Sequence, residues 1–354
     1  MFAFLILWYR FQWLRLLLTL GLPMIKDDRV IEIARMNIEQ NLSQEDISIK
    51  LGISRATVSR ALKEARNRGY IRTIVVPPSS QADMLVEWIK RSYDLKYVAV
   101  TPAREDVDEA MDLIAQVAAN YFEHNTFEST RIGVAGGRTV MSMVKRLRPA
   151  NRSGSLILPI MGCWLEHSAI SATEIAREIA LRWNAQAEAL FIPAFVPDEA
   201  ARQGLLRVSS IAETLDKAKQ LDFACIGVAS VSADLKIGKK EYVSGSGRVS
   251  EIDLEQLLAH GAVGEICAQF FDEYGNTIEF WNQSKYIAVS LEDLRKVRDV
   301  LALGAEKEKA RAFLGGCKLG IIKSLIVSES LAVEMYRLHN EKKGEEKNGI
   351  TKYP

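Results

Sequence analysis

The chain has 354 residues, 48% of them hydrophobic and 26% charged, and its 46 basic and 45 acidic side chains leave a net charge of +1. This length indicates two or three globular domains, and the composition excludes collagen, a disordered scaffold and a coiled-coil rod. The balanced charge excludes a protein that coats nucleic acid with its whole surface, but it allows a local basic patch. Because the four cysteines lie dozens of residues apart, we expect no metal site, no disulfide framework and a reducing, cytoplasmic setting for Cys163, Cys225, Cys267 and Cys317.

Residues 1–23 are apolar and aromatic almost throughout and differ in composition from the rest of the chain. Arg10, Gln12 and Arg15 interrupt the apolar run, so it fits neither a membrane span nor a signal peptide, whose charges precede the apolar core. We interpret the segment as an upstream extension from a misplaced start codon, with Met24 as the true beginning. A membrane anchor is the less favoured alternative, so we expect no membrane partner.

Residues 24–77 have the pattern of a winged helix-turn-helix DNA-binding domain. Apolar periodicity and capping residues predict three helices and a strand, over residues 24–40, 44–50, 55–68 and 70–76. A short turn that contains Gly52 separates the second helix from the third, as the helix-turn-helix layout requires, and the strand suits a wing.

The third predicted helix is strongly basic. Residues 54–72 hold six basic side chains and one acidic side chain, a local charge of +5. A solvated basic helix in an unrelated helical domain is the alternative, but the capping and turn pattern from Gln44 to Arg60 favours DNA binding. The exposed side chains are of types that bind phosphates or base edges in the major groove. We therefore expect DNA contacts from Gln44, Ser54, Arg55, Thr57, Ser59, Arg60 and Lys63.

Residues 78–95 are expected to link two domains. Prolines and serines at positions 77–80 make a stiff connection, and residues 81–94 predict a helix. This helix either connects the domains, joins two copies of the chain through Met84, Leu85, Trp88 and Ile89, or packs on its own domain. Because helix-turn-helix modules usually read paired half-sites, we expect a dimer or tetramer.

Residues 96–340 alternate between strand-like and helical patterns, which indicates an α/β domain with a doubly wound, mostly parallel sheet. The expected helices cover residues 105–122, 139–147, 171–183 and 201–220. The mixed-charge tail 341–354 predicts disorder. The expected strands cover residues 97–101, 131–135, 156–160, 187–191, 223–226, 264–271, 278–280, 297–303 and 325–327.

Residues 131–140 combine a strand, a Gly-Gly turn and the start of a helix at Arg138 and Thr139. Backbone N–H groups, a helix N-terminus, a guanidinium and a hydroxyl converge there, and this combination suits a phosphate monoester. The motif is neither a P-loop nor a full GxGxxG, and a tight strand-to-helix turn that simply needs glycine is the alternative.

Several motifs follow the helix-turn-helix in a fixed order: IGVAGGRTV at 132–140, LPIMGCW at 158–164, DFACIGVAS at 222–230, GAVGEICAQFFDEYGN at 261–276 and VLALGAEKEKARAFLGG at 300–316. This order resembles the SorC family of bacterial sugar-responsive transcriptional regulators over about residues 24–340. The resemblance implies an effector domain like that of sugar-phosphate isomerases and deaminases. It also implies phosphate on Gly136, Gly137, Arg138 and Thr139, and a sugar facing Asp272 and Lys309.

The chain departs from that family where a Gly-Gly pair usually precedes the lysine, because Ala305 and Glu306 occupy those positions. We expect these side chains to crowd the ligand and the carboxylate to repel an anion, so the ligand differs from the family norm or binds weakly. For Asp272 the alternative is a turn residue that bonds its own backbone, and for Lys309 it is a solvated lysine.

The sequence therefore predicts a regulator that binds operator DNA and responds to a phosphorylated sugar or related small carbohydrate, with no cofactor and no catalytic residues. The alternative is a sugar-phosphate isomerase or deaminase with an accessory helical domain. An enzyme of that type needs an acid/base pair, and only Asp272 and Lys309 are candidates, without a supporting histidine motif.

Overall fold

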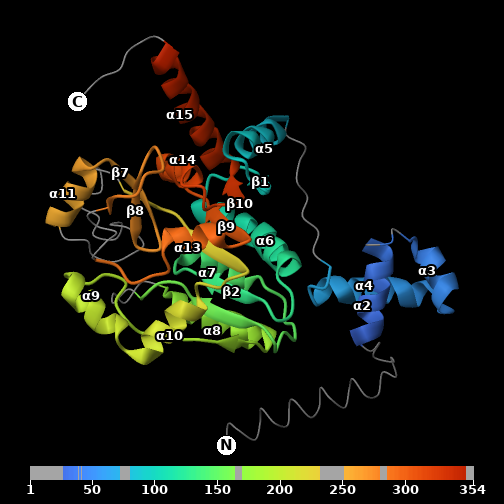
Figure 1. Ribbon diagram of the computed structural model, residues 1–354. Helices are drawn as coiled ribbons and strands as arrows, with labels where there is room; N and C mark the ends of the chain where they lie inside the picture. The colour runs from blue at the N-terminus through green and yellow to red at the C-terminus, as the bar shows by residue number, and fades with distance from the viewer. Residues whose placement is uncertain are drawn as a thin grey trace, which may run out of the picture. The chain divides into compact units, whose positions relative to one another are not determined.

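The computed structural model describes residues 27–38, 40, 42–71, 80–163, 170–231, 251–279 and 285–347 (Figure 1). The chain divides into two compact units, residues 1–75 and residues 76–354. The predicted extension 1–23, most of the predicted wing and the proline linker lie outside the described residues. None of the described helices is both long and apolar enough to cross a membrane.

The described residues of the first unit form three helices, as predicted. Ser43 begins its second helix with a capping box, because the Ser43 side chain accepts a hydrogen bond from Asp46 N while the Asp46 carboxylate accepts one from Ser43 N. Gly52, at a φ of 62°, ends this helix in the left-handed conformation that glycine adopts without strain. The helices are α2 (Asp27–Ile38), α3 (Gln44–Leu51) and α4 (Arg55–Asn67).

A small apolar core holds the three helices together. Ile33 from α2, Ile47 from α3 and Leu62 from α4 are almost fully buried in one cluster. Ile71, which follows α4, is also buried in this cluster. Packing of these side chains fixes the angle between α3 and α4, which is the geometry that a helix-turn-helix presents to DNA.

The second unit is built on a seven-stranded sheet in which every pair of neighbouring strands is parallel. The strand order is β1-β10-β9-β5-β2-β3-β4, so the doubly wound, parallel arrangement is confirmed. The strands are β1 (Tyr97–Thr101), β2 (Arg131–Val134), β3 (Leu156–Pro159), β4 (Gln186–Ala187), β5 (Phe223–Gly227), β9 (Asp299–Gly304) and β10 (Ser324–Ser328).

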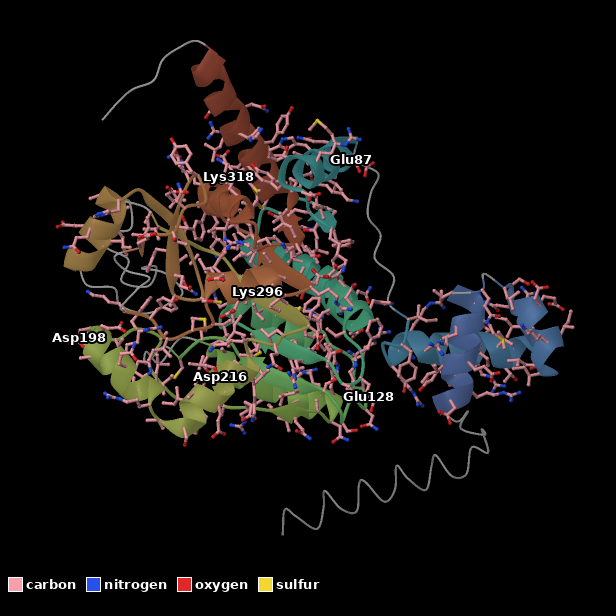
Figure 2. All side chains as sticks on the ribbon, in the orientation of Figure 1. Glu87, Glu128, Asp198, Asp216, Lys296 and Lys318 are labelled. Atoms are coloured by element: carbon pink, nitrogen blue, oxygen red, sulfur yellow. The ribbon has the colours of Figure 1, made fainter. Side chains whose placement is uncertain are left out.

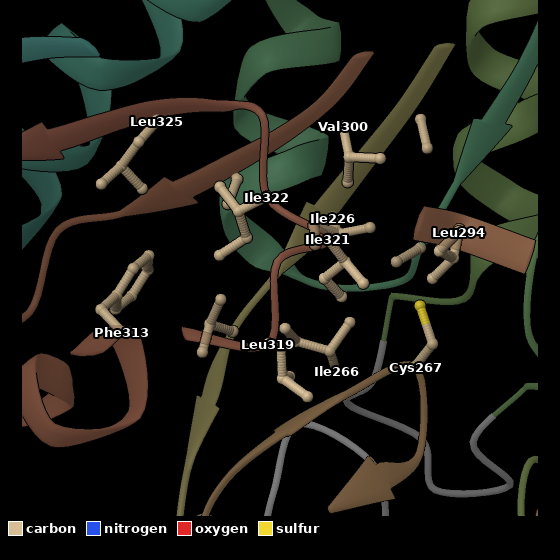
Figure 3. Packing of buried hydrophobic residues seen from close by; sticks show 14 of the residues in the cluster. Ile226, Ile266, Cys267, Leu294, Val300, Phe313, Leu319, Ile321, Ile322 and Leu325 are labelled. Atoms are coloured by element: carbon tan, nitrogen blue, oxygen red, sulfur yellow. The ribbon is translucent and has the colours of Figure 1, made fainter. Parts of the chain in front are cut away.

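Both faces of this sheet are buried. Along β9, Val300 and Ala302 join one hydrophobic cluster, whereas Leu301 and Leu303 join another, as the alternation of side chains along a strand requires. Figure 3 shows part of the first cluster, in which Val300 lies among residues from several elements. The first cluster includes side chains of α5 (Ser80–Tyr93), α13 (Leu291–Lys296), α14 (Ala310–Lys318) and α15 (Glu329–Lys347). The second includes side chains of α6 (Val107–Asn125), α7 (Arg138–Lys145) and α8 (Ala172–Trp183).

Helix α5 packs on its own domain, which is one of the three roles expected for it. Leu85 and Ile89 are buried in the first cluster, and the Trp88 ring meets the Tyr336 ring of α15 edge-on at a centroid distance of 5.0 Å. Only Met84 of the four predicted contact residues is strongly exposed, at 45%. The apolar face that we considered for joining two copies is therefore used inside the chain.

One predicted strand is wrong, because residues 264–271 form two antiparallel strands instead of one. Cys267 and Ala268 make the turn between them at φ values of 51° and 66°, a conformation for which the sequence offers no glycine. The apolar run therefore conceals the turn. The resulting three-stranded sheet has the order β6-β7-β8, with β6 (Ala229–Ser230), β7 (Ala262–Ile266) and β8 (Gln269–Asp272).

Other predicted elements need smaller corrections. The helix expected over 201–220 is two helices, α9 (Glu199–Leu206) and α10 (Ser209–Lys217), because Val208 takes an extended conformation. The strand expected over 187–191 ends at Ala187, since Leu190 N bonds the Thr173 side chain instead of a strand.

Two further boundaries also differ from the prediction. Ile278 makes a backbone hydrogen bond to Phe270 O but begins no strand, and residue 280 lies outside the described residues. Helix α15 continues through Lys347, so the predicted disordered tail starts too early, because Glu and Lys are good helix formers. Helix α11 (Glu251–Ala259) precedes β7.

Candidate functional site

Helix α4 presents a polar face opposite its buried one. Val58, Ala61, Leu62 and Ala65 face the core, whereas the predicted contact residues Ser54, Arg55, Ser59, Arg60 and Lys63 are exposed, and Gln44 and Thr57 are half-exposed. The Arg55 side chain is 72% exposed, and its nearest described carboxylate, that of Glu45, lies 3.9 Å away. This contact places the start of α3, with Gln44, near the start of α4, whereas Arg60 and Lys63 lie further along α4.

Two of these seven residues also have a structural role. Ser54 Oγ accepts a hydrogen bond from Thr57 N at 3.2 Å and lies 2.9 Å from Thr57 Oγ1, so the pair caps α4. The Arg60 guanidinium lies within 3.4 Å of Thr57 Oγ1 and of Ala56 O, which holds the side chain along the helix. Of the basic side chains predicted for DNA, these contacts orient Arg60.

The Gly-Gly turn lies at the carboxyl end of β2. Gly137 precedes α7 at a φ of 125° and a ψ of 157°, a region that side chains rarely occupy. Its N–H donates to Ile170 O at 3.0 Å, so the turn offers fewer available backbone donors than the sequence suggested. No side chain in the described part of the chain caps α7, which leaves its first turn to face the carboxyl edge of the sheet.

Glu306 brings two of the predicted effector residues together. Its Oε1 lies 3.7 Å from Arg138 Nη2, and its Oε2 lies 3.0 Å from Lys309 Nζ. Only 11% of the Glu306 side chain and 16% of the Lys309 side chain are exposed, so the alternative of a solvated Lys309 is wrong. We shall refer to Arg138, Glu306 and Lys309 as the charged cluster.

The topology of the sheet explains why Arg138 and Glu306 lie close together. Arg138 follows β2, and Glu306 follows β9, and these two strands flank β5. A Cβ atom added at Gly227, where β5 ends, would lie 4.0 Å from Gly136 O, so the ends of β5 and β2 are close. In open parallel sheets, ligands bind beyond the carboxyl ends of the strands, which is where the charged cluster lies.

Ala305 does not crowd the candidate site. It is 4% exposed and belongs to the second hydrophobic cluster of the sheet, so its side chain points toward the core. The predicted crowding by Ala305 is therefore wrong, whereas the Glu306 side chain lies in the charged cluster. The sequence predicts that Glu306 crowds the ligand and repels an anion, but it does not reveal the pairing of Glu306 with Arg138 and Lys309.

Asp272 lies away from the charged cluster. Its carboxylate accepts hydrogen bonds from Tyr274 N at 2.9 Å and from Asn276 N at 2.8 Å, as well as from the Asn276 side chain. The turn that it forms packs on the C-terminal end of α14, where Lys318 Nζ donates to Glu273 O at 2.9 Å. Lys318, the last residue of α14, is labelled in Figure 2. Because Lys309 precedes the first residue of α14, the structure places Asp272 and Lys309 toward opposite ends of that helix. The geometry favours the alternative of a turn residue.

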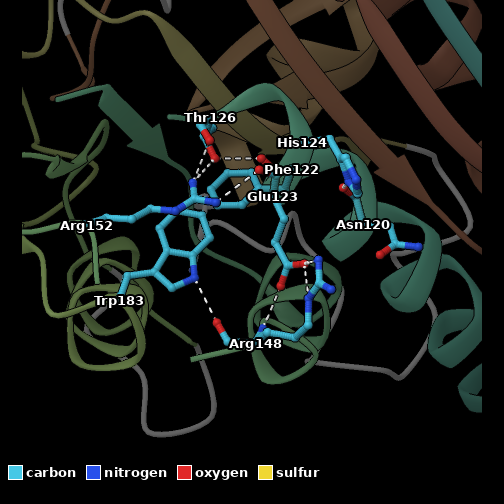
Figure 4. Close-up of polar contacts among 8 residues, drawn as sticks. All are labelled: Asn120, Phe122, Glu123, His124, Thr126, Arg148, Arg152 and Trp183. Carbon is cyan, nitrogen blue, oxygen red and sulfur yellow. Dashed lines mark hydrogen bonds and ion pairs between the residues drawn. The ribbon is translucent and has the colours of Figure 1, made fainter. Parts of the chain in front are cut away.

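A second charged group, shown in Figure 4, is satisfied within the protein. The Arg152 guanidinium donates to Thr126 O and Glu123 O and stacks 3.8 Å from the centre of the Trp183 ring. Glu123 in turn pairs with Arg148. These contacts join the ends of α6 and α8, so we assign the group to stability. Among the described residues, no group of His, Cys, Asp or Glu side chains is placed to hold a metal ion.

Comparison with known proteins agrees with this architecture. The model of a "Putative sugar-binding domain" matches residues 78–336, and a Crp-like helix-turn-helix domain matches residues 14–77. These matches place the chain among transcriptional regulators that join a helix-turn-helix to a sugar-binding domain. The chain belongs to the SorC family of sugar-binding transcriptional regulators.

Relatives of known name span nearly the whole chain. The deoxyribonucleoside regulator of Bacillus subtilis is 26% identical over 288 residues, which cover 80% of this chain and 89% of the relative. The sorbitol operon regulator of Klebsiella pneumoniae is 24% identical over 307 residues, which cover 86% and 96%. The crystal structure of that full-length regulator superposes with a TM-score of 0.65 over 86% of this chain and 97% of the other, at 24% identity.

Proposed function

We propose that this regulator binds operator DNA through α4 and that a phosphorylated sugar, held at the Gly136–Thr139 turn, changes its affinity for that DNA. The observation that carries the proposal is the meeting of Arg138 and Lys309 at the carboxyl edge of the sheet, beside the start of α7. Two cations and a helix N-terminus together are suited to a phosphate group.

The proposed phosphate contacts follow from the geometry of the turn. Arg138 and Thr139 are the first two residues of α7, so their side chains and the first-turn amides share one end of the helix. Lys309 adds a second cation from the loop between β9 and α14. Asp272 is not included in this proposed site, because its carboxylate serves its own turn.

The names of the relatives support a small polyhydroxylated effector. They refer to a deoxyribonucleoside, to sorbitol and, in a third relative from Brucella abortus that is 21% identical, to erythritol catabolism. Sugar hydroxyls need polar partners near the phosphate, and the ends of β5 and β3, the two neighbours of β2, border the turn on the sheet edge.

Effector binding can control DNA binding only if the two sites are thermodynamically coupled. The sugar phosphate must bind the DNA-competent and DNA-free forms with different affinities, and the coupling is then reciprocal. We further propose that the chain acts in the cytoplasm as a dimer or tetramer, since paired half-sites need two helix-turn-helix units. A monomer by light scattering at micromolar concentration would contradict this assembly.

Two experiments with the full chain test the proposal. Selection from a random pool of duplexes should retain a defined sequence, and a thermal-shift screen of sugar phosphates should raise the melting temperature with selected members, because a ligand of the folded state stabilises it. Rapid turnover of a sugar phosphate with no retention of any duplex would contradict a regulator and support an enzyme.

A further inference from the structure

The charged cluster contains a carboxylate at the position where an anionic ligand would need the cations. Glu306 pairs with Lys309 at 3.0 Å and with Arg138 at 3.7 Å, and these are the two cations that we propose for phosphate. The Glu306 and Lys309 side chains are mostly buried, at 11% and 16% exposure, whereas 58% of Arg138 is exposed. Burial of an ionised carboxylate is costly unless cations neutralise it, and Arg138 and Lys309 are the two cations placed to do so.

The charges show why the carboxylate and the ligand compete. One carboxylate and two cations leave the cluster with a net charge of +1. A phosphate monoester carries about −1.5 to −2 at pH 7, so it is matched by both cations only when Glu306 no longer pairs with them. If Glu306 stayed in place, its negative charge would repel the phosphate across a few ångströms in a partly water-excluded site.

We infer that Glu306 is a specificity-determining residue that acts as an internal competitor for the effector's anionic group. In the absence of effector it occupies Arg138 and Lys309, and an anionic effector binds by displacing it. The inference rests on the proposed phosphate site at the Gly136–Thr139 turn and deepens it. It predicts that Glu306 lowers the affinity for any small anion at this turn while stabilising the empty site.

Displacement of Glu306 also ties ligand binding to the backbone. Glu306 lies directly between the end of β9 and the short 3-10 helix η2 (Lys307–Lys309), which leads into α14. Release of its side chain from Arg138 therefore breaks a link between the start of α7 and the segment that follows β9. Binding of an anion changes the constraints on the start of α14, which packs against β7 and α15.

The test uses inorganic phosphate as the probe and the full chain. Isothermal titration calorimetry at constant ionic strength compares the wild type with Glu306→Gln and with Glu308→Gln. Glu308 is an exposed carboxylate two residues away, so its variant removes the same charge from the same turn without altering the Arg138–Glu306 and Glu306–Lys309 ion pairs. We expect phosphate affinity to rise on the order of tenfold in Glu306→Gln and to change less than about twofold in Glu308→Gln.

A double mutant tests whether the gain in phosphate affinity of Glu306→Gln depends on Lys309. If Glu306 acts through the cations, the gain in affinity of Glu306→Gln disappears when Lys309→Met is added, because one of the competed cations is gone. Thr139→Ala should weaken phosphate binding in both the wild-type and the Glu306→Gln background. Circular dichroism confirms that each variant is folded, and Glu306→Ala carries the same prediction if the glutamine variant does not fold.

The outcomes separate this inference from the function on which it rests. If Glu306→Gln binds phosphate no more tightly than the wild type, while Thr139→Ala still weakens binding, Glu306 is not a competitor but the phosphate site stands. If Thr139→Ala leaves phosphate binding unchanged in both backgrounds, or none of the proteins binds phosphate, the proposed site is wrong and the inference falls with it.

Discussion

Arg138, the first residue of α7, and Glu306, which follows β9, form an ion pair with Nη2 and Oε1 3.7 Å apart, and the strands that precede them, β2 and β9, lie on opposite sides of β5. A parallel sheet makes this contact possible, because the carboxyl ends of all its strands lie along one edge. Gly227, at the end of the intervening strand β5, has no side chain to separate the start of α7 from the segment after β9. The ion pair therefore marks the part of the sheet edge where we propose that the effector binds.

The basic face of α4 gives the first prediction. Replacing Arg55 or Arg60 by alanine should weaken binding to the selected duplex by about 1 to 3 kcal/mol if the side chain reads a base, and by a smaller amount if it contacts phosphate. Fluorescence anisotropy at a fixed salt concentration measures the change. Arg91→Ala is the control, since this arginine is also highly exposed but belongs to α5 of the other unit. Equal affinity of all four proteins would show that α4 is not the recognition helix.

The conformation of Gly137 gives the second prediction. A φ of 125° is strained for any side chain, so Gly137→Ala should lower the free energy of unfolding by about 1 to 3 kcal/mol. It should also distort the start of α7 and abolish the response to a sugar phosphate. Gly204→Ala, in the middle of α9 with open space around the added methyl group, should instead stabilise the protein by about 0.5 to 1 kcal/mol. Urea denaturation measures the free energy of unfolding of both variants. A Gly137→Ala variant as stable as the wild type would contradict the backbone geometry of the turn.

Asp272 should behave as a structural residue. Because its carboxylate accepts hydrogen bonds from the backbone of Tyr274 and Asn276, Asp272→Ala should cost about 1 to 2 kcal/mol of stability and leave the effector's affinity nearly unchanged. Asp272→Asn, which keeps one acceptor oxygen, should lower the stability less than Asp272→Ala does. Calorimetric titration with the effector found by the thermal-shift screen distinguishes the two roles. A folded Asp272→Ala variant that no longer binds the effector would show that Asp272 belongs to the effector site.

The cysteines give a prediction about pH. Burial raises the pKa of the Cys225 and Cys267 thiols, and it raises the pKa of Cys317 to about 12, whereas Cys163 is only half-buried. A thiol reagent at pH 8 should therefore label one cysteine quickly in the native protein, and Cys163→Ser should remove that fast phase.

The same buried thiols make the stability of the protein depend on pH. Unfolded thiols ionise near pH 8.5, so the folded state holds more protons above this pH. Stability should accordingly fall as the pH rises above about 8.5. Rapid native labelling of Cys317 would contradict the structure.

The sequence predicts those parts of the fold that are specified by neighbouring residues. The capping box of Ser43 and Asp46 and the left-handed Gly52 locate α3 because each signal lies within a few residues of the helix end. The central strands are recognisable because both faces are buried, which makes each strand a continuous apolar run. The β7–β8 hairpin has the same apolar character, and its turn at Cys267 and Ala268 lacks the usual turn residues, so it was missed.

The candidate site is predictable only in part, for a related reason. The Gly-Gly turn is a local motif, and its place before a helix could be read from the sequence. The pairing of Arg138 with Glu306 depends on the order of strands in the sheet, which no local pattern encodes. Asp272 shows the opposite limit, since its local sequence fits both a sugar ligand and a turn, and only the hydrogen bonds to Asn276 and Tyr274 favour the turn.

One measurement tests the central claim most directly: the dissociation constant of the selected duplex, measured by anisotropy with and without a saturating sugar phosphate, for the wild type and for Thr139→Ala. We predict that the ligand changes the wild-type dissociation constant at least about fivefold, which corresponds to a coupling free energy near 1 kcal/mol. Thr139→Ala should bind the duplex equally well and show no change with the ligand. A wild-type affinity that no stabilising sugar phosphate alters, or a Thr139→Ala variant that responds as the wild type does, would contradict control of DNA binding from the Gly136–Thr139 turn.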